Sequence, residues 1–144
     1  MNLRWITVLL AVLLASCAAP SAENLAFRET CLLSRYNCTG IAPPLVRITP
    51  LTARAGLYGV YFGGRTIWLS HTLATPEERY VVMTHEMTHY LQTQVDGNGV
   101  PFLTLFEKCV YEEEAYEVSN VVAQRLKQPH LINTNLSGYS CGAP

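Results

Sequence analysis

The chain has 144 residues, enough for one compact domain and too few for two. Its formal net charge is −1 and its lysines and arginines form no run or patch, which excludes the strongly basic nucleic-acid-binding classes. We therefore expect no nucleic-acid partner.

The N-terminus has the composition of a secretory signal peptide over residues 1–16. Arg4 supplies the positive charge, and residues 5–14 form an apolar stretch that is too short to cross a bilayer. The stretch runs into Leu14-Ala15-Ser16-Cys17, which resembles the bacterial lipobox, a sequence whose cysteine is lipidated and becomes the new N-terminus.

The lipobox resemblance implies a lipoprotein of the bacterial cell envelope. Acyl chains on Cys17 would anchor the protein in a membrane, facing the periplasm or the exterior, and residues 17–23 would be the lipidated N-terminus and a tether. The alternative is an ordinary signal peptide that is cut nearby, for example after Ala19, so that Cys17 is discarded.

The other four cysteines are an even number in a chain that is expected to be exported, which indicates two disulfides. Of the three possible pairings we favour Cys31 with Cys38, closing a short loop, and Cys109 with Cys141, tying the C-terminal tail to a helix. A four-cysteine zinc site is the competing interpretation, but the chain lacks the close Cys-x-x-Cys pairs that such sites use.

The first half of the exported part predicts one helix and three strands. Residues 24–36 form a candidate helix, and residues 45–49 alternate between apolar and polar side chains like a short strand. Residues 57–62 and 66–70 flank the turn Gly63-Gly64-Arg65, which predicts a β-hairpin.

The strongest helix signal begins at Thr75. This residue is a candidate N-cap, Pro76 suits the first helical position, and Glu78 stands three residues after the cap, where it completes a capping box. The helix is expected to end near Gln94, and it is apolar on nearly every side, which predicts burial. Its apolar residues are Tyr80, Val81, Val82, Met83, Met87, Tyr90 and Leu91.

This buried helix carries the sequence His85-Glu86-Met87-Thr88-His89. Positions i and i+4 of a helix lie on the same face, so His85 and His89 can bind one metal ion, and Glu86 can act as a general base on a water at an open coordination position. The alternative is that these residues are ordinary polar residues of a helix. That reading leaves their burial unexplained, because buried polar groups need partners, which a metal site supplies.

A catalytic zinc site needs a third protein ligand, and residues 107–127, a second predicted helix stopped by Pro129, offer several glutamates. The apolar stripe of this helix marks its buried side and consists of Tyr111, Ala115, Val118, Val122 and Leu126. Glu113 and Glu117 point away from the stripe. Glu112 and Glu114 flank it on opposite sides, so helical geometry leaves both as candidates.

The hairpin, the His-Glu-x-x-His helix and the later Glu112-x-x-Ala115 together resemble the gluzincin metallopeptidases over residues 56–127. The resemblance implies that residues 24–144 form a minimal zincin-like α+β domain, with a small antiparallel or mixed sheet of about three strands packed on the two long helices. In several of these families the third zinc ligand stands three residues before an alanine. This favours Glu112, with Glu114 as the second choice.

Two further expectations come from this resemblance. The strand at residues 66–70 would be the sheet edge beside the cleft, where an extended peptide can bind by main-chain hydrogen bonds. Many relatives have an aspartate after the alanine that orients a ligand histidine, whereas this chain has Tyr116, whose hydroxyl would be the substitute partner. We expect His71 and His130 to be ordinary surface histidines.

The function implied by the resemblance is hydrolysis of a peptide or protein substrate by a zinc-dependent peptidase. One Zn²⁺ would be bound by His85, His89 and Glu112, and Glu86 would be the general base. The alternative is a non-catalytic zinc-binding envelope lipoprotein that acts as an interaction or assembly module. Glu86 favours the enzyme, because a non-catalytic site has no use for a base at that position.

Overall fold

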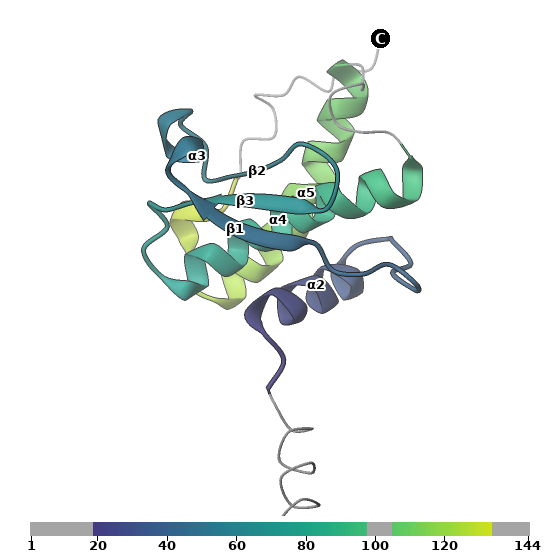
Figure 1. Ribbon diagram of the computed structural model, residues 1–144, viewed down its shortest axis with the longest axis horizontal. Coiled ribbons are helices and arrows are strands. Elements are labelled where there is room, and N and C mark those ends of the chain that lie inside the picture. The colour runs from purple at the N-terminus through teal and green to yellow at the C-terminus, as the bar shows by residue number, and fades with distance from the viewer. Residues whose placement is uncertain (1–18, 98–104, 134–144) are drawn as a thin grey trace, which may run out of the picture.

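The structure, a computed structural model, describes residues 19–97 and 105–133. These residues form four α-helices and a three-stranded mixed sheet, which confirms the predicted α+β class (Figure 1). The predicted signal peptide, Cys17 and Cys141 lie outside the described residues. Within the described ranges, no helix is both long and apolar enough to cross a membrane.

Helix α2 (Ala22–Leu33) begins two residues before the predicted start of the domain. Ser21 is its N-cap and accepts a hydrogen bond from the backbone N–H of Asn24, which satisfies one of the unpaired donors of the first turn. The helix ends at Leu33 and not at residue 36 as predicted, because Ser34 is already extended. Its buried face packs against helix α4.

The sheet contains β1 (Leu45–Thr49), β2 (Gly59–Tyr61) and β3 (Thr66–Ser70) in the order β1-β3-β2. Strands β2 and β3 pair antiparallel as the predicted hairpin, whereas β1 pairs parallel with β3. The expectation that β3 is the edge beside the cleft is therefore wrong. Strand β3 lies in the middle, and β2 is the edge strand on the side of the site.

Helix α3 (Pro50–Arg54) connects β1 to the hairpin and was not predicted. Thr49 ends β1 and also caps this helix, since its side chain accepts a hydrogen bond from the backbone N–H of Leu51. Pro50 occupies the first turn, where a missing N–H costs nothing. A helix of five residues is too short to show a helical period in the sequence.

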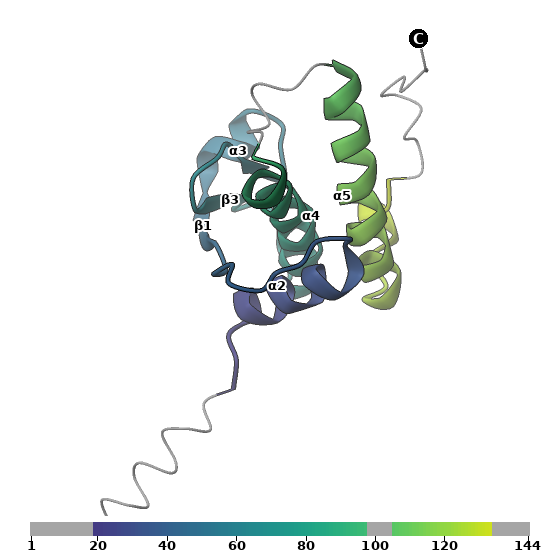
Figure 2. The same ribbon diagram turned by 90° about the vertical axis from the view of Figure 1, so that its right-hand side faces the viewer.

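Helix α4 (Pro76–Asp96) lies between the sheet and helix α5 (Leu105–Arg125) (Figure 2). Helix α2 also packs against α4. The predicted capping box is present, with Thr75 and Glu78 each accepting from the other's backbone N–H. The helix continues two residues beyond the predicted end, to Asp96, and Gly97, whose backbone is left-handed (φ 72°), is its C-cap.

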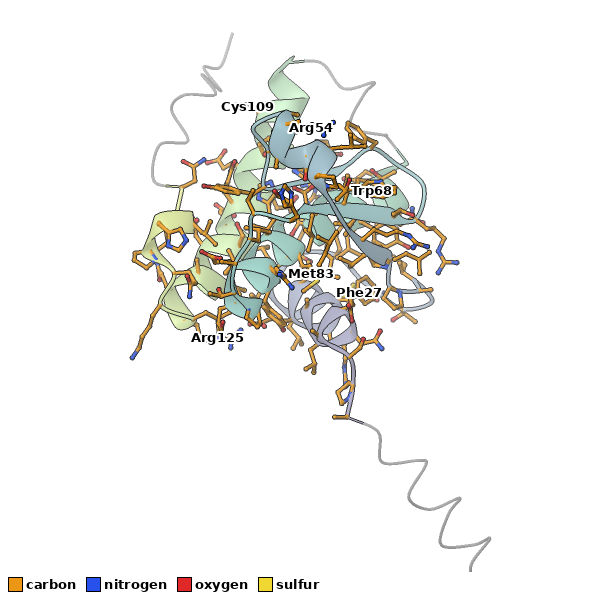
Figure 3. The ribbon with its side chains drawn as sticks, turned by 60° about the vertical axis from the view of Figure 1, so that its left-hand side comes forward. Phe27, Arg54, Trp68, Met83, Cys109 and Arg125 are labelled. Carbon is orange, nitrogen blue, oxygen red and sulfur yellow. A yellow bond between two sulfur atoms is a disulfide. The ribbon has the colours of Figure 1, made fainter. Side chains whose placement is uncertain are left out.

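Two apolar clusters hold these layers together. The larger one fills the space between the sheet, α2 and α4, and includes Phe27 and Met83 (Figure 3). The smaller one contains Val81 of α4 and Val122 and Ala123 of α5. Most of the predicted apolar stripe of α5 is buried, as its spacing indicated. The 3-10 helix η2 (Pro129–Leu131) follows α5.

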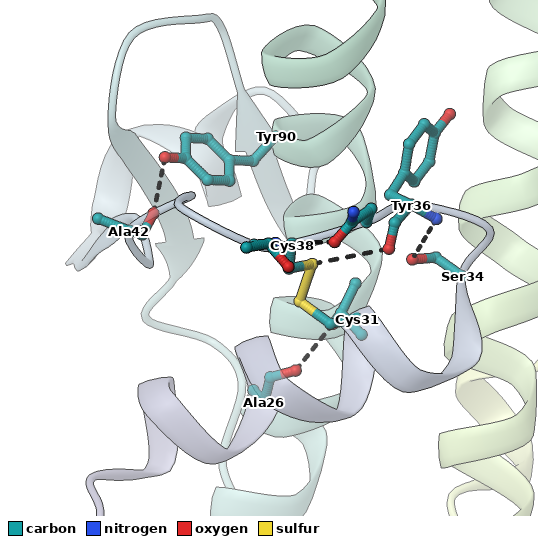
Figure 4. Close-up of a disulfide and its surroundings, with 10 residues drawn as sticks. Ala26, Cys31, Ser34, Tyr36, Cys38, Ala42 and Tyr90 are labelled. Carbon is teal, nitrogen blue, oxygen red and sulfur yellow. Dashed lines mark hydrogen bonds between the residues drawn. A yellow bond between two sulfur atoms is a disulfide. The ribbon is translucent and has the colours of Figure 1, made fainter.

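The predicted disulfide between Cys31 and Cys38 is present and ties the end of α2 to the segment before β1 (Figure 4). Cys109 is also disulfide-bonded. Its pairing with Cys141 stays a prediction, because Cys141 lies outside the described residues.

We expect Thr75→Ala to lower the free energy of unfolding by about 0.5–2 kcal/mol, because the N-cap acceptor of α4 is lost. Thr75→Ser is the matched control and should retain most of the stability, since its hydroxyl can accept the same hydrogen bond. Denaturant unfolding followed by circular dichroism measures both. Equal stability of the alanine and serine variants would show that the cap contributes nothing.

Candidate metal centre

Three predicted site residues converge where α4 packs against α5. The Nε2 atoms of His85 and His89 lie 3.2 Å apart. The Glu112 carboxylate reaches both, with one oxygen 3.4 Å from His85 Nε2 and the other 3.3 Å from His89 Nε2. Among the described residues, this is the group of histidine, cysteine, aspartate and glutamate side chains whose atoms come close enough to hold one ion.

These separations suit a tetrahedral zinc ion. Bonds of about 2.0–2.1 Å from a tetrahedral centre place its ligand atoms about 3.3–3.4 Å apart. The three measured distances between donor atoms are 3.2, 3.3 and 3.4 Å. Two imidazole nitrogens and one carboxylate oxygen are also a donor set typical of catalytic zinc, which leaves a fourth position for water or substrate. The residues therefore fit Zn²⁺ in both geometry and chemistry.

The electrostatics of the cluster favour a cation. Burial by itself would raise the pKa of Glu112, but hydrogen bonds and charge from His85 and His89 outweigh this and hold the pKa well below its usual range. Burial would lower the pKa of His89, but the nearby carboxylates raise it overall. The cluster therefore favours positive charge between the two imidazoles and the carboxylate, which a divalent ion can supply.

Glu86 lies beside the cluster, beneath strand β2. It is 6% exposed, and its burial raises the pKa of its carboxyl group although the two histidines act in the opposite direction. The backbone N–H of Tyr61 donates a hydrogen bond to this carboxylate. A carboxylate with a raised pKa next to a metal site is suited to accepting and returning a proton.

Gly59 allows β2 to approach α4 this closely. A Cβ atom at this position would lie 2.6 Å from Val82 Cγ1 and 2.9 Å from a Glu86 carboxylate oxygen. Only glycine leaves room for both groups. The sequence contained no signal for this role, because it depends on the packing of the strand against the helix.

Two neighbours orient the histidine rings, and the sequence analysis missed one of them. His89 Nδ1 hydrogen-bonds the side chain of Gln92 at 2.7 Å, a partner that the His89-x-x-Gln92 spacing on one helix face could have indicated. Within the described residues, His85 Nδ1 has no hydrogen-bond partner. The Tyr116 ring packs on the His85 ring, with centroids 4.4 Å apart, and its hydroxyl does not bind His85 Nδ1.

The other candidates lie elsewhere. The Glu114 carboxylate faces the opposite side of the α4 and α5 contact, where it binds Gln92, Tyr36 and Arg35. Glu113 and Glu117 are exposed, as predicted from the helical wheel. His71 is exposed and does not line the site.

A cavity of about 780 Å³ opens over the donor atoms. The β2 segment lines it with Leu57, Tyr58 and Phe62, and η2 and the residue after it line it with Leu131 and Ile132. His130 also lines the cavity and contacts Glu78 at 3.0 Å, so it is closer to the site than expected. The site is thus accessible from outside through a largely apolar opening.

Comparison of the chain with protein-family profiles, with curated proteins and with solved structures gives no significant match.

We expect the purified protein to bind one equivalent of Zn²⁺, and Glu112→Gln to weaken binding by more than about 100-fold, beyond the range seen for loss of an outer hydrogen-bond partner. Glu113→Gln is the matched control and should bind zinc like the wild type, because its side chain is exposed on the same helix. Competition with a chromophoric chelator measures each dissociation constant. Equal affinities of the two variants would exclude Glu112 as a ligand.

We expect Gly59→Ala to lower the free energy of unfolding by about 1–3 kcal/mol through overpacking against α4. Shortening the nearest side chain with Val82→Ala should relieve part of this cost. A double-mutant cycle measured by denaturant unfolding should therefore show a favourable coupling of about 0.5–3 kcal/mol. Strict additivity would mean that β2 simply moves away from the helix.

Proposed function

We propose that the chain is a zinc-dependent peptidase of the bacterial cell envelope. The observation that carries this proposal is the spacing of the His85, His89 and Glu112 donor atoms, with the buried carboxylate of Glu86 at their side. A zinc site kept only for structure is closed by four protein ligands, whereas the described residues supply three donors here and these open into a cavity.

His85, His89 and Glu112 would hold the ion. Bound Zn²⁺ supplies Lewis-acid chemistry, which polarises a carbonyl group and lowers the pKa of water to about 7. Glu86 would take the proton from the attacking water and deliver it to the leaving amine. Burial of the Glu86 carboxylate raises its pKa and thereby makes it a better base than an exposed glutamate.

The edge strand β2 supports an extended peptide as the substrate. The Tyr58 carbonyl accepts from Ser70 of β3, and the register pairs Val60 with Trp68, so the peptide groups of Gly59 and Tyr61 face away from β3. The Tyr61 N–H binds Glu86 on this side. Gly59 and Tyr61 both line the cavity beside the donor atoms. A peptide that adds to this edge would bring a scissile bond next to Glu86.

The location rests on the lipobox at Cys17, which would place the domain at a membrane surface through its acyl chains. The Cys31–Cys38 disulfide supports an oxidising compartment, because disulfides persist outside the cytosol. The bacterial periplasm and the cell exterior are such compartments. The cleavable substrates would then be peptides or proteins of the envelope.

We expect zinc-loaded protein to cleave members of a broad peptide library, and Glu86→Gln to reduce the rate by at least about 10²–10⁴-fold, the usual contribution of a general base. Zinc content should stay at the wild-type value, since Glu86 is not among the donor atoms. Mass spectrometry of the library and metal analysis of the same samples measure the two effects. Equal cleavage by the two proteins would exclude Glu86 as the base, and no cleavage by the wild type would favour a non-catalytic zinc module.

A further inference from the structure

We infer that Gln92 is a positioning residue that fixes which nitrogen of His89 faces the metal, and that Glu114 and the loop closed by the Cys31–Cys38 disulfide hold Gln92 in the required orientation. This inference rests on the proposed function insofar as His89 is a zinc ligand. Glu114, which the sequence offered as the second candidate for the third zinc ligand, instead orients Gln92.

The contact between Gln92 and His89 is short and shielded from water. Gln92 Oε1 lies 2.7 Å from His89 Nδ1, and the Gln92 side chain is 1% exposed. The other ring nitrogen, Nε2, faces His85 and Glu112. A buried imidazole held at both nitrogens cannot rotate without losing a hydrogen bond, which costs about 1–3 kcal/mol for each buried group left unpaired.

The orientation of the Gln92 amide is set by its other two contacts. Gln92 Nε2 lies 2.9 Å from the backbone carbonyl of Tyr111 and 3.1 Å from a Glu114 carboxylate oxygen. A carbonyl and a carboxylate only accept, so the NH₂ end of the amide must face them and the oxygen must face His89. Nδ1 of His89 therefore carries a proton and donates it to Gln92, which leaves the Nε2 lone pair for the metal.

Glu114 is held in turn from the segment after α2. Tyr36 donates its hydroxyl to one carboxylate oxygen at 2.8 Å, and Arg35 Nε donates to the other at 3.0 Å. Tyr36 is 6% exposed, and Arg35 also reaches Asp96 at the end of α4 at 3.3 Å. These contacts fix the carboxylate between α4 and α5.

The disulfide encloses both of these residues. Cys31 and Cys38 are seven residues apart in sequence, and Arg35 and Tyr36 lie on the loop between them. Figure 4 shows Tyr36 projecting from this loop on the side of α5, away from Tyr90. The crosslink limits the conformations of a loop without regular secondary structure, so it presents Tyr36 and Arg35 to Glu114. A continuous set of contacts thus leads from the disulfide loop to a ligand histidine.

The test compares Gln92→Met with Tyr80→Phe. The methionine keeps the length of the side chain but removes both of its polar ends. Tyr80→Phe removes a hydrogen bond of the same kind, between α4 and Glu29 of α2, away from the donor atoms. We expect Gln92→Met to raise the zinc dissociation constant about 10–100-fold, as loss of an outer partner of a ligand histidine does, and Tyr80→Phe to leave it unchanged.

A spectroscopic readout separates positioning from general loss of stability. With zinc bound, long-range ¹H–¹⁵N correlation spectra of the imidazoles should show His89 Nδ1 protonated in the wild type and in Tyr80→Phe, because Nε2 then faces the metal. The double variant Gln92→Glu with Glu114→Gln again offers an acceptor to Nδ1, and avoids two adjacent carboxylates. It should recover the Nδ1 proton and part of the zinc affinity that Gln92→Met loses, because the Tyr111 carbonyl still lacks its donor. It also provides the comparison if Gln92→Met does not fold.

An unprotonated His89 Nδ1 in the wild type would overturn the inference, as would unchanged zinc affinity in a folded Gln92→Met variant or equal loss of affinity in Tyr80→Phe. The spectrum of the zinc-loaded protein shows which nitrogen of His89 is protonated even if no peptide is cleaved. A protonated Nδ1 together with an inactive wild type would therefore refute the peptidase and leave the positioning role of Gln92 in place.

Discussion

The structure depends on helix α4 being buried on nearly all sides while carrying side chains that do not tolerate burial without partners. The sheet, α2 and α5 all pack against it. Its inward-facing polar residues include Glu86, His89 and Gln92, each no more than 6% exposed. Unpaired polar groups in such a position cost several kcal/mol. The arrangement around α4 is the one in which nearly every such group has a partner.

The partners of these polar side chains come from α5, from β2 and from the loop after α2, and each element contributes differently to the site. Helix α5 contributes Glu112, which completes a set of donor atoms with the spacing of a tetrahedral ion. Strand β2 contributes the Tyr61 N–H, which binds Glu86 at the sheet edge and leaves its carboxylate next to an open cavity. The loop after α2 contributes Tyr36 and Arg35, which act on His89 only through Glu114 and Gln92.

The order of the strands shows where sequence patterns stop being informative. Alternation of apolar and polar residues located β1, and the turn Gly63-Gly64-Arg65 located the hairpin, because each such pattern is a local property of the chain. These patterns did not show that β1 pairs parallel with β3, which moves β3 to the centre and makes β2 the edge beside the site. The helical wheel of α5 had the same limit. It placed Glu112 and Glu114 on two flanks of the buried stripe, and only the rotation of α5 against α4 decides which flank meets the histidines.

The sequence by itself determined the capped helix that carries His85, Glu86 and His89 on adjoining positions, the predicted hairpin and the α+β class. These features follow from local backbone geometry, in which a spacing of four residues or an alternation of two fixes the face on which a side chain lies. The tertiary structure alone decided that Glu112 joins the two histidines, that Glu114 binds Gln92, and that Gly59 admits β2 against Glu86. Those contacts join elements whose relative rotation and depth are set by the packing of their apolar surfaces, and no spacing within one segment specifies them.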